Sequence, residues 1–544
     1  MKKSLQLLHW LLAATLLLAV SPLGVTAAVP NKLADPPGLE WQKNKKPVTL
    51  DLFINYTWFG LNWTDPTAAR VTKRTGVTVN IMKPVADDNQ KLNIMIAGNS
   101  LPDMVILGKD NPALPMMIKA GSVYAMDDLI AKYAPKFKSI LRKEMLRNYK
   151  SDDGKTYYLP DFVEGEDFRK MALENNGLIS MNQSVWSVRK DYYDEIGRPD
   201  MSTPEKFNQA LAKMAAKHPD KIPFYPADEA LSSRMLDQQQ NLRNIGNQFG
   251  VGDQYYVTGK EIKWAVRDPK FLDTLKFLHN LQTQNLLTKD PFIDSKDVQT
   301  AKVNNGDPIV YTWTIGDGEK IPADNKNSHY EILKPFPTYR QFRLGDGWNA
   351  VLISKKAKDP ARCIRFLEYC YSVQGHKDLS WGLEGDSFRG DVVKGPHYKL
   401  VDGLPVHLPA YLKLKTADWP GVASKNGLGE YWFCNDSVLW NLPFWNKNDK
   451  RLTEFNREFG KYVEYHPELS GINPVAGDDE TIIRQKVIDI MKDSVAKIVF
   501  AKDENSAVAE YHNFISKCEA AGLVKLEKYW TAKYQAKMKS MGLK

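Results

Sequence analysis

The hydrophobic pattern changes near residue 48, where short apolar runs begin to alternate with stripes of apolar residues spaced three or four apart. Short runs rich in Val, Ile and Leu are typical of strands, and the wider spacing is typical of helices. Their alternation predicts a parallel sheet with crossover helices. Ligands of such sheets bind beyond the carboxyl ends of the strands. The predicted strands are 48–54, 76–81 and 102–108, and the predicted helices are 65–74 and 91–97.

The same α/β pattern continues through the middle of the chain. Thr203 and Asp359 are each followed by a proline, which is typical of a helix start. The first of these helices is predicted to end near Lys217, and strands are predicted at 308–313 and 349–354. The last hundred residues are predicted to be mostly helical. One apolar stripe there is predicted to face a core; it consists of Ile483, Val487, Ile490, Met491, Val495 and Ile498.

The N-terminus has the pattern of a secretory signal peptide. Lys2 and Lys3 precede an apolar run over 5–20, and a Pro- and Gly-containing break and a small-residue cleavage site follow. The run is short for a membrane anchor, which needs about 20 apolar residues. We therefore predict a cleaved signal peptide over 1–28, and a flexible leader over 29–47 because Pro, Lys, Asn and Gly dominate there.

Composition limits the classes of function. The 544 residues are 43% hydrophobic and 26% charged, which is ordinary for a globular protein that divides into two or more domains. The formal net charge is +9, but Lys and Arg are spread along the chain, so no nucleic-acid partner is expected. Cys363 and Cys370 lie seven apart in a predicted helix, about 10.5 Å along its axis, which is too far for a disulfide. The sequence leaves open whether Cys434 and Cys518 pair.

Catalytic motifs are absent from the sequence. There is no G-x-S-x-G elbow, no H-E-x-x-H and no phosphate-binding loop, and the nine histidines lack the spacing of metal ligands. Adjacent carboxylates such as Asp152 and Asp153 are best interpreted as solvated turns. We therefore predict no enzyme activity, no cofactor and no metal.

Aromatic residues are abundant, with 14 Trp, 24 Tyr and 21 Phe, and several lie where a strand meets a loop. A flat indole suits the apolar face of a pyranose ring, and nearby polar side chains can pair with its hydroxyls. The predicted stacking residues are Trp58, Trp63, Trp186, Trp313, Trp348 and Trp432. The predicted polar contacts are Asn55, Asp161, Arg189, Asn349 and Glu384, although Arg189 and Glu384 are equally open to interpretation as structural ion pairs.

Several motifs, in order, resemble one family: the extracellular solute-binding proteins of carbohydrate ABC importers, in the long oligosaccharide-binding branch. The early part combines 76–79 with the Gly-Asn-Ser-Leu-Pro-Asp-Met-Val sequence of 98–105, and the middle part combines 186–193 with 203–207. The most specific stretch runs from Ile353-Ser354-Lys355-Lys356 to Trp381-Gly382-Leu383-Glu384-Gly385. The closing part is 500–523.

The resemblance implies an α/β, two-lobed, periplasmic-binding-protein-like fold. Each lobe is then a sheet flanked by helices, and a hinge and an interlobe cleft separate the two. We place the first lobe at 48–178 plus 334–390 and the second at 179–333 plus 391–544. The Pro-, Gly- and Asn-containing passage over 385–429 is expected to be loop-like and to border the cleft.

The resemblance also implies a function. We expect a monomeric protein, exported to the periplasm or the extracellular face of the membrane, that captures an oligosaccharide and delivers it to ABC permease subunits. The sequence leaves open whether the oligosaccharide contains uronic acid. The alternatives are a sensing receptor of the same fold, an exported polysaccharide-active enzyme and, more remotely, a peptide-binding protein. Two features depart from some family members. No lipid-attachment cysteine stands at the cleavage site, and the loop over 216–223 is too short and too poor in carboxylates to bind calcium.

Overall fold

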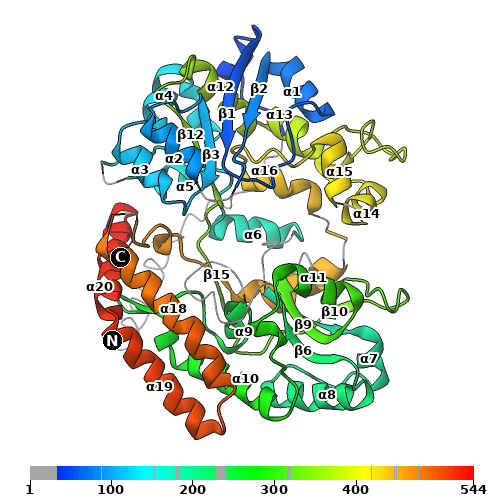
Figure 1. Ribbon diagram of the computed structural model, residues 1–544. Coiled ribbons are helices and arrows are strands. Elements are labelled where there is room, and N and C mark those ends of the chain that lie inside the picture. The colour runs from blue at the N-terminus through cyan, green and yellow to red at the C-terminus, as the bar shows by residue number, and fades with distance from the viewer. Residues whose placement is uncertain are drawn as a thin grey trace, which may run out of the picture.

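A computed structural model of the protein describes residues 33–86, 89–151, 153–177, 184–227, 241–314, 320–417, 419–445, 447–448, 450–475 and 477–543. The predicted signal peptide, 1–28, lies outside the described residues. The described part forms two lobes, each built on its own sheet, with α6 (Glu166–Glu174) between them (Figure 1).

The first lobe contains the sheet that the hydrophobic pattern predicts. Its strand order is β2-β1-β3-β12-β4, and β1 pairs in parallel with both β2 and β3. The parallel arrangement predicted for 48–108 is thereby confirmed, and β12 joins the sheet antiparallel to β3. The strands are β1 (Val48–Ile54), β2 (Val77–Met82), β3 (Met104–Gly108), β4 (Leu159–Pro160) and β12 (Asn349–Ile353).

Helices cover this sheet, and local sequence sets their ends. Asp65 accepts a hydrogen bond from the backbone N–H of Ala68 and caps α1. Asp359 caps α12 in the same way, and the helix start predicted there is confirmed. Gly76 ends α1 in the left-handed conformation. The helices of this lobe are α1 (Pro66–Thr75), α2 (Gln90–Ala97), α3 (Ala113–Lys119), α4 (Met126–Tyr133), α5 (Lys143–Arg147), α12 (Pro360–Tyr371), α13 (Val373–His376), α14 (Pro409–Ala417), α15 (Trp419–Asn426) and α16 (Ser437–Asn441).

The second lobe has a four-stranded sheet of order β10-β5-β9-β6. The predicted strand over 308–313 is β9, which pairs in parallel with β6 and antiparallel with β5. The strands are β5 (Ser184–Arg189), β6 (Ile222–Pro226), β9 (Pro308–Thr314) and β10 (Tyr330–Ile332), with a separate hairpin of β7 (Tyr255–Thr258) and β8 (Glu261–Trp264).

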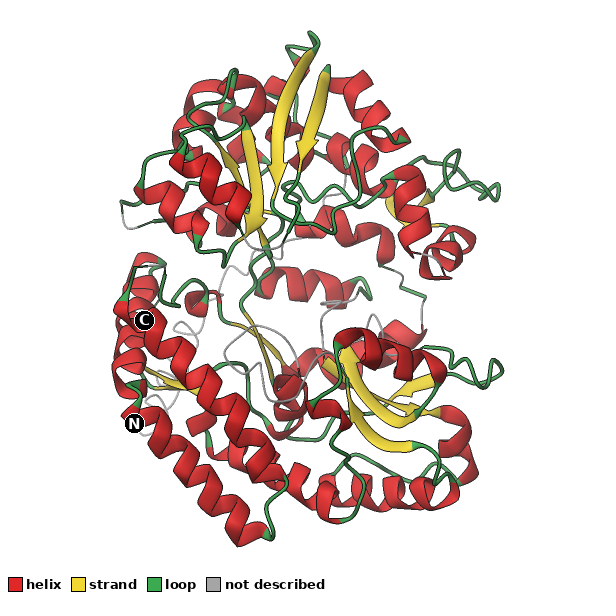
Figure 2. Ribbon diagram, in the orientation of Figure 1, coloured by secondary structure: helices red, strands yellow, loops and turns green. Residues whose placement is uncertain are grey.

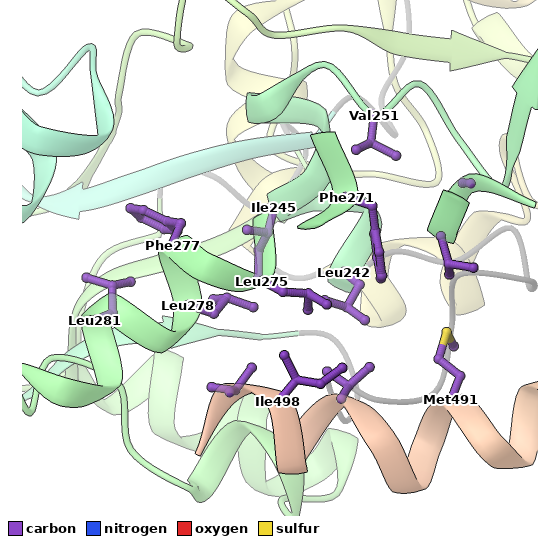
Figure 3. Packing of buried hydrophobic residues seen from close by; sticks show 14 of the residues in the cluster. Leu242, Ile245, Val251, Phe271, Leu275, Phe277, Leu278, Leu281, Met491 and Ile498 are labelled. Carbon is purple, nitrogen blue, oxygen red and sulfur yellow. The ribbon is translucent and has the colours of Figure 1, made fainter. Parts of the chain in front are cut away.

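A large apolar core holds the helices of the second lobe together. The side chains of Leu275 and Leu278 on α10 meet Met491 and Ile498 on α18 (Figure 3). The stripe predicted to face a core on the last helices is therefore confirmed, because Val487, Met491, Val495 and Ile498 are all buried there. The helices are α7 (Lys190–Glu195), α8 (Pro204–Lys217), α9 (Asn241–Phe249), α10 (Pro269–Thr283), α11 (Lys296–Asn305), α17 (Lys450–Phe459), α18 (Asp479–Val499), α19 (Glu504–Ala520) and α20 (Leu523–Ser540).

A two-stranded ribbon connects the lobes. β11 (Gln341–Arg343) pairs in parallel with β15 (Val463–Tyr465), and β15 lies between the two sheets in Figure 1. Arg340 donates from Nε and Nη2 to the two carboxylate oxygens of Glu464, at 2.7 and 2.8 Å, and so joins the ends of the ribbon. Narrow connecting strands between two lobes are typical of a hinge.

The predicted flexible leader is wrong for 33–47, which packs on the first lobe. Leu39 and Trp41 are buried, because Trp41 packs edge-on against Tyr369 at 5.1 Å between ring centroids. The backbone N–H of Trp41 donates to Glu368 Oε2 at 2.7 Å. The prediction failed because the polar, Pro- and Gly-containing composition of this segment outweighed its two buried apolar residues, Leu39 and Trp41.

The predicted boundary at 391 also requires correction, because the chain after it stays with the first lobe for about fifty residues. Tyr431, Phe433 and Cys434 belong to the first lobe's core, and Tyr431 Oη donates to the Asp65 carboxylate. The passage predicted as a loop contains α14, α15 and a hairpin of β13 (Tyr398–Val401) and β14 (Leu404–His407).

All four cysteines are free and buried. Cys363 and Cys370 pack in the first lobe's core, as predicted for small apolar side chains. Cys434 lies in the same core, whereas Cys518 lies in the core of the second lobe. These two side chains therefore do not pair.

Candidate functional site

Aromatic rings form a continuous row on the first lobe. Tyr56 packs against Trp58 at 5.1 Å and against Trp348 at 5.3 Å between ring centroids. Trp348 packs against Trp432 at 5.5 Å, and Trp432 packs against Trp440 at 5.6 Å. We call these five residues the aromatic row. Three of them, Trp58, Trp348 and Trp432, are predicted site residues that the fold brings together.

The aromatic row lies where the sheet of the first lobe turns toward the second lobe. Tyr56 and Trp58 follow β1, and Trp348 immediately precedes β12, which runs antiparallel to β3. The carboxyl ends of β1 and β3 point toward the second lobe (Figure 2). Trp58 is 57% exposed, which is unusual for an indole, and Trp348 and Trp432 are half-buried. An exposed aromatic surface of this kind is typical of a binding site.

Two buried polar residues support the row from behind. Asn349 Oδ1 accepts a hydrogen bond from Tyr56 Oη at 2.6 Å, and the Asn349 backbone N–H donates to Asp161 Oδ1 at 3.0 Å. Asp161 and Asn349 are both buried, and Asp161 Oδ2 and Asn349 Nδ2 have no hydrogen-bond partner in the described part of the chain, so their contact with a ligand remains a prediction. Burial raises the pKa of Asp161 to about 8, although backbone N–H groups oppose that rise.

The raised pKa predicts a pH-dependent stability. The folded protein retains a proton on Asp161 between about pH 4 and 8, where an unfolded Asp has lost it, so stability falls as pH rises through this window. Asp161→Asn keeps an acceptor for the Asn349 N–H and removes the titration. We expect the variant to lose about 4 kcal/mol less stability than the wild type between pH 5 and 8. Melting temperatures at the two pH values measure this, and parallel pH profiles would contradict it.

Asn55 lies at the end of β1 within a small amide network. Its Nδ2 donates to Asn89 Oδ1 at 2.6 Å, and Asn111 Nδ2 donates to the same oxygen at 2.8 Å. Asn55 is half-buried, so its remaining polar atoms stay near the carboxyl edge of the sheet. Its predicted contact with a ligand hydroxyl remains a prediction.

Two predicted stacking residues are core residues, and their assignment is corrected here. Trp186 is 2% exposed and is enclosed by Phe207, Phe224 and Phe336 at 4.9–5.3 Å between ring centroids. Trp63 is 8% exposed, packs edge-on against Tyr431, and donates from Nε1 to Thr72. Both indoles are buried among neighbouring aromatic rings in this structure, which makes them core residues.

Trp313 and Glu384 do not join the aromatic row. Trp313 is largely buried at the end of β9, with the Lys320 ammonium 5.5 Å from its ring centroid. Because Trp313 lies at the end of a strand in the second lobe, its contact with a ligand stays a prediction. Glu384 is exposed beside the β13–β14 hairpin, where it accepts a hydrogen bond from Tyr398 Oη at 3.3 Å.

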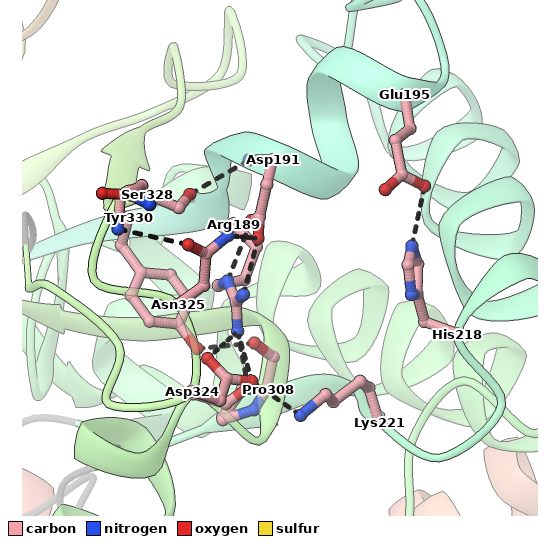
Figure 4. Close-up of polar contacts among 12 residues, drawn as sticks. Arg189, Asp191, Glu195, His218, Lys221, Pro308, Asp324, Asn325, Ser328 and Tyr330 are labelled. Atoms are coloured by element: carbon pink, nitrogen blue, oxygen red, sulfur yellow. Dashed lines mark hydrogen bonds and ion pairs between the residues drawn. The ribbon is translucent and has the colours of Figure 1, made fainter.

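Arg189 is a structural ion pair, which is one of the two roles that the sequence left open. It is 1% exposed at the end of β5 and donates to Asp191 at 2.7 Å and to Asp324 at 3.0 Å (Figure 4). Its guanidinium also lies 4.3 Å from the ring centroid of Tyr192. These ion pairs explain how a charged guanidinium can be buried. Arg189 and its partners lie at the carboxyl end of β5, and Ser184 begins the strand at its other end.

Two members of the aromatic row were missed from sequence. Tyr56 stands two residues before Trp58 in the same aromatic run, so its position after a strand was an available signal. Trp440 had no such signal, because it reaches the row only through the packing of α16 on the first lobe.

Within the described ranges, no helix is both long enough and apolar enough to span a bilayer. Over the same residues, no group of three or more His, Cys, Asp or Glu side chains is arranged to hold a metal ion.

Comparison with known proteins decides the family. The family model described as bacterial extracellular solute-binding protein matches residues 67–385, more than half of the chain. The chain belongs to this family. The resemblance found in the motifs is thereby confirmed, and this solute-binding protein acts outside the cytoplasm, as predicted.

Two curated relatives share extended sequence similarity with this solute-binding protein. The fructooligosaccharide ABC transporter substrate-binding protein FusA of Streptococcus pneumoniae is 24% identical over 393 residues, which are 69% of this chain and 70% of FusA. The polygalacturonan/rhamnogalacturonan-binding protein YtcQ of Bacillus subtilis is 20% identical over 341 residues, which are 59% of this chain and 63% of YtcQ. Both relatives are binding proteins.

Solved structures confirm the two-lobed fold. FusA in complex with kestose superposes with a TM-score of 0.65 at 17% identity, covering 90% of this chain and 99% of FusA. The alginate-binding protein AlgQ2 without calcium superposes with a TM-score of 0.64 at 16% identity, covering 90% and 99%. Identities this low establish the architecture of the solute-binding protein, not its ligand.

Proposed function

We propose that this solute-binding protein captures an oligosaccharide between its two lobes and delivers it to an ABC permease. The observation that carries the proposal is the aromatic row, with Trp58 57% exposed at the carboxyl edge of the sheet. Indole faces match the apolar faces of sugar rings, and successive rings suit successive sugar units. FusA, a relative described as a fructooligosaccharide ABC transporter substrate-binding protein, supports the same chemistry.

Closure of the lobes provides the coupling to transport. A ligand stacked on the row also contacts the second lobe when the β11–β15 ribbon lets the lobes approach. Because those contacts exist only in the closed form, the ligand stabilises that form by its differential affinity. The permease then recognises the closed, loaded protein.

The boundaries of the lobes, the absence of catalysis and the monomeric state belong to the same proposal. The first lobe comprises 33–177, about 345–390 and the following chain to about residue 445, and the second comprises 184–344 and the chain after about residue 450, because Phe336, Phe342 and Leu344 pack in the second lobe's core. A sensing receptor would have the same site, so the protein's membrane partner distinguishes the two roles. Purification of the permease complex by a tagged solute-binding protein tests this choice.

A thermal-shift screen tests ligand binding directly. An oligosaccharide at 100 times its Kd stabilises the folded protein by about 2.7 kcal/mol, so we expect the melting temperature to rise by several degrees. The matching monosaccharides serve as controls, since one unit covers only part of the row. The same incubations, analysed by chromatography, should contain no new product. Cleavage of any oligosaccharide would contradict a purely binding role, and the absence of a shift with every glycan would contradict the proposal.

A further inference from the structure

Several of the buried polar atoms without hydrogen-bond partners lie on α9 and the segment after it, which pack against the ribbon. In the described part of the chain, Arg243 Nε, Asn244 Oδ1 and both side-chain amide atoms of Gln254 have no hydrogen-bond partner. All three residues are at most 6% exposed. Each unpaired buried polar atom costs about 1–3 kcal/mol, so a cluster of them indicates groups that a ligand satisfies.

The cluster is placed within reach of the aromatic row. α9 lies at the side of the second lobe that faces the ribbon and the first lobe (Figure 1). The segment after it packs on β11, since the Phe342 N–H donates to the Gly252 carbonyl at 2.9 Å. Arg343 of β11 and Trp348 of the row are five residues apart, so at most about 18 Å separates their Cα atoms. A short oligosaccharide spans that distance.

The charges within the cluster are balanced. Arg243 Nη1 lies 3.6 Å from Asp253 Oδ1, and Arg343 Nη2 donates to Glu164 Oε2 at 3.3 Å. Burial raises the pKa of both carboxyl groups, and the facing guanidinium groups oppose that rise. Each of these two guanidinium groups thus faces a carboxyl group, and neither offers an unpaired charge to a carboxylate ligand.

The unpaired atoms include both donors and acceptors. Arg243 Nε and Gln254 Nε2 donate, whereas Asn244 Oδ1 and Gln254 Oε1 accept. A sugar hydroxyl both donates and accepts, so it can pair with groups of either kind, whereas a carboxylate group pairs only with the donors. Resting on the proposed function, we infer that Arg243, Asn244 and Gln254 form a second-lobe subsite for sugar hydroxyls, and that the ligand is a neutral oligosaccharide.

The relatives do not decide this point, because FusA is described as binding fructooligosaccharide and YtcQ as binding polygalacturonan, which is acidic. One cation favours an acidic ligand instead. Lys83 Nζ is exposed near Trp58, where it donates to the carbonyl oxygens of Thr57 and Phe59. Those two hydrogen bonds already occupy the Lys83 ammonium. The second-lobe subsite, in contrast, offers several unpaired hydrogen-bonding groups that are more deeply buried.

Calorimetric titration with two panels tests the inference. The neutral panel contains kestose and malto-, xylo- and cello-oligosaccharides, and the acidic panel contains oligomers of galacturonate and alginate. We expect binding only within the neutral panel, with an affinity that is unchanged between 50 and 500 mM salt, because no charge pairing with the ligand is involved. Preferred binding of an acidic oligomer that weakens with salt would overturn the inference while leaving the proposed function intact.

Substitutions test the subsite itself. We expect Asn244→Ala and Gln254→Ala each to weaken binding of the neutral ligand about tenfold, because a bound hydroxyl loses its partner. Thr288→Ala is the matched control, since Thr288 Oγ1 is also buried and unpaired in the described second lobe but lies next to Lys289, whose ammonium packs on Phe500 far from the ribbon. Wild-type affinity in both subsite variants would overturn the assignment. If no glycan of either panel binds, the proposed function itself fails.

Discussion

Trp58→Ala is expected to weaken oligosaccharide binding about thirtyfold with little loss of stability. The indole is 57% exposed and touches neighbours mainly through Tyr56 and Trp348, so its removal leaves no cavity in the core. A bound sugar buries the remaining face, and burying an aromatic side chain contributes about 2 kcal/mol, which corresponds to a factor of about thirty in Kd. Titration of the neutral ligand, with the melting temperature measured alongside, provides both values.

Ile94→Ala is the control for this experiment. Ile94 is 65% exposed on α2 of the same lobe, away from the aromatic row. Its truncation removes a comparable exposed apolar side chain, and we expect unchanged affinity. Equal affinity of Trp58→Ala and the wild type would show that ligands do not stack on the exposed end of the row.

Gly347→Ala is expected to destabilise the protein by about 3 kcal/mol and to impair binding as well. A Cβ atom at this position would lie 2.0 Å from Asp161 Oδ1 and 2.9 Å from the backbone nitrogen and oxygen of Phe162. No rotamer relieves a clash with backbone, so the segment that leads through Trp348 into β12 must shift. The melting temperature, expected to fall by several degrees, and the Kd of the ligand measure the two effects.

Gly60→Ala is the matched control, because it also lies next to the aromatic row. No atom lies within 4 Å of a Cβ built on Gly60. We expect this variant to stay within about 0.5 kcal/mol of the wild type. Wild-type stability of Gly347→Ala would show that the segment between Arg343 and Trp348 adapts freely, which would also weaken the argument for a precisely placed row.

Local elements were predictable because their causes are local. Asp65 and Asp359 cap helices through hydrogen bonds to backbone N–H groups three residues ahead, and such pairs are visible in any short window of sequence. The boundaries of β1 agree with the prediction to the residue, since the run from Val48 to Ile54 is uninterrupted. The leader over 33–47 was mispredicted because its anchors are distant. Trp41 is held by Tyr369 and Glu368, more than 300 residues away.

The candidate site was predictable only in part, for the same reason. Trp58 follows a strand and Trp186 lies within one. The residues next to them in the sequence do not indicate which of the two indoles is exposed and which is buried. Trp186 is buried because Phe207 of α8, Phe224 of β6 and Phe336 of the loop before β11 converge on it.

The sequence alone determined the elements, their caps, the α/β order and the family, because these depend on contacts between near neighbours and on ordered motifs. Tertiary structure alone decided which aromatic side chains stay exposed, that Arg189 is a structural ion pair, and that the unpaired groups of Arg243, Asn244 and Gln254 gather beside the ribbon. Each of these outcomes depends on partners brought together across long stretches of chain, and burial is a property of that three-dimensional packing.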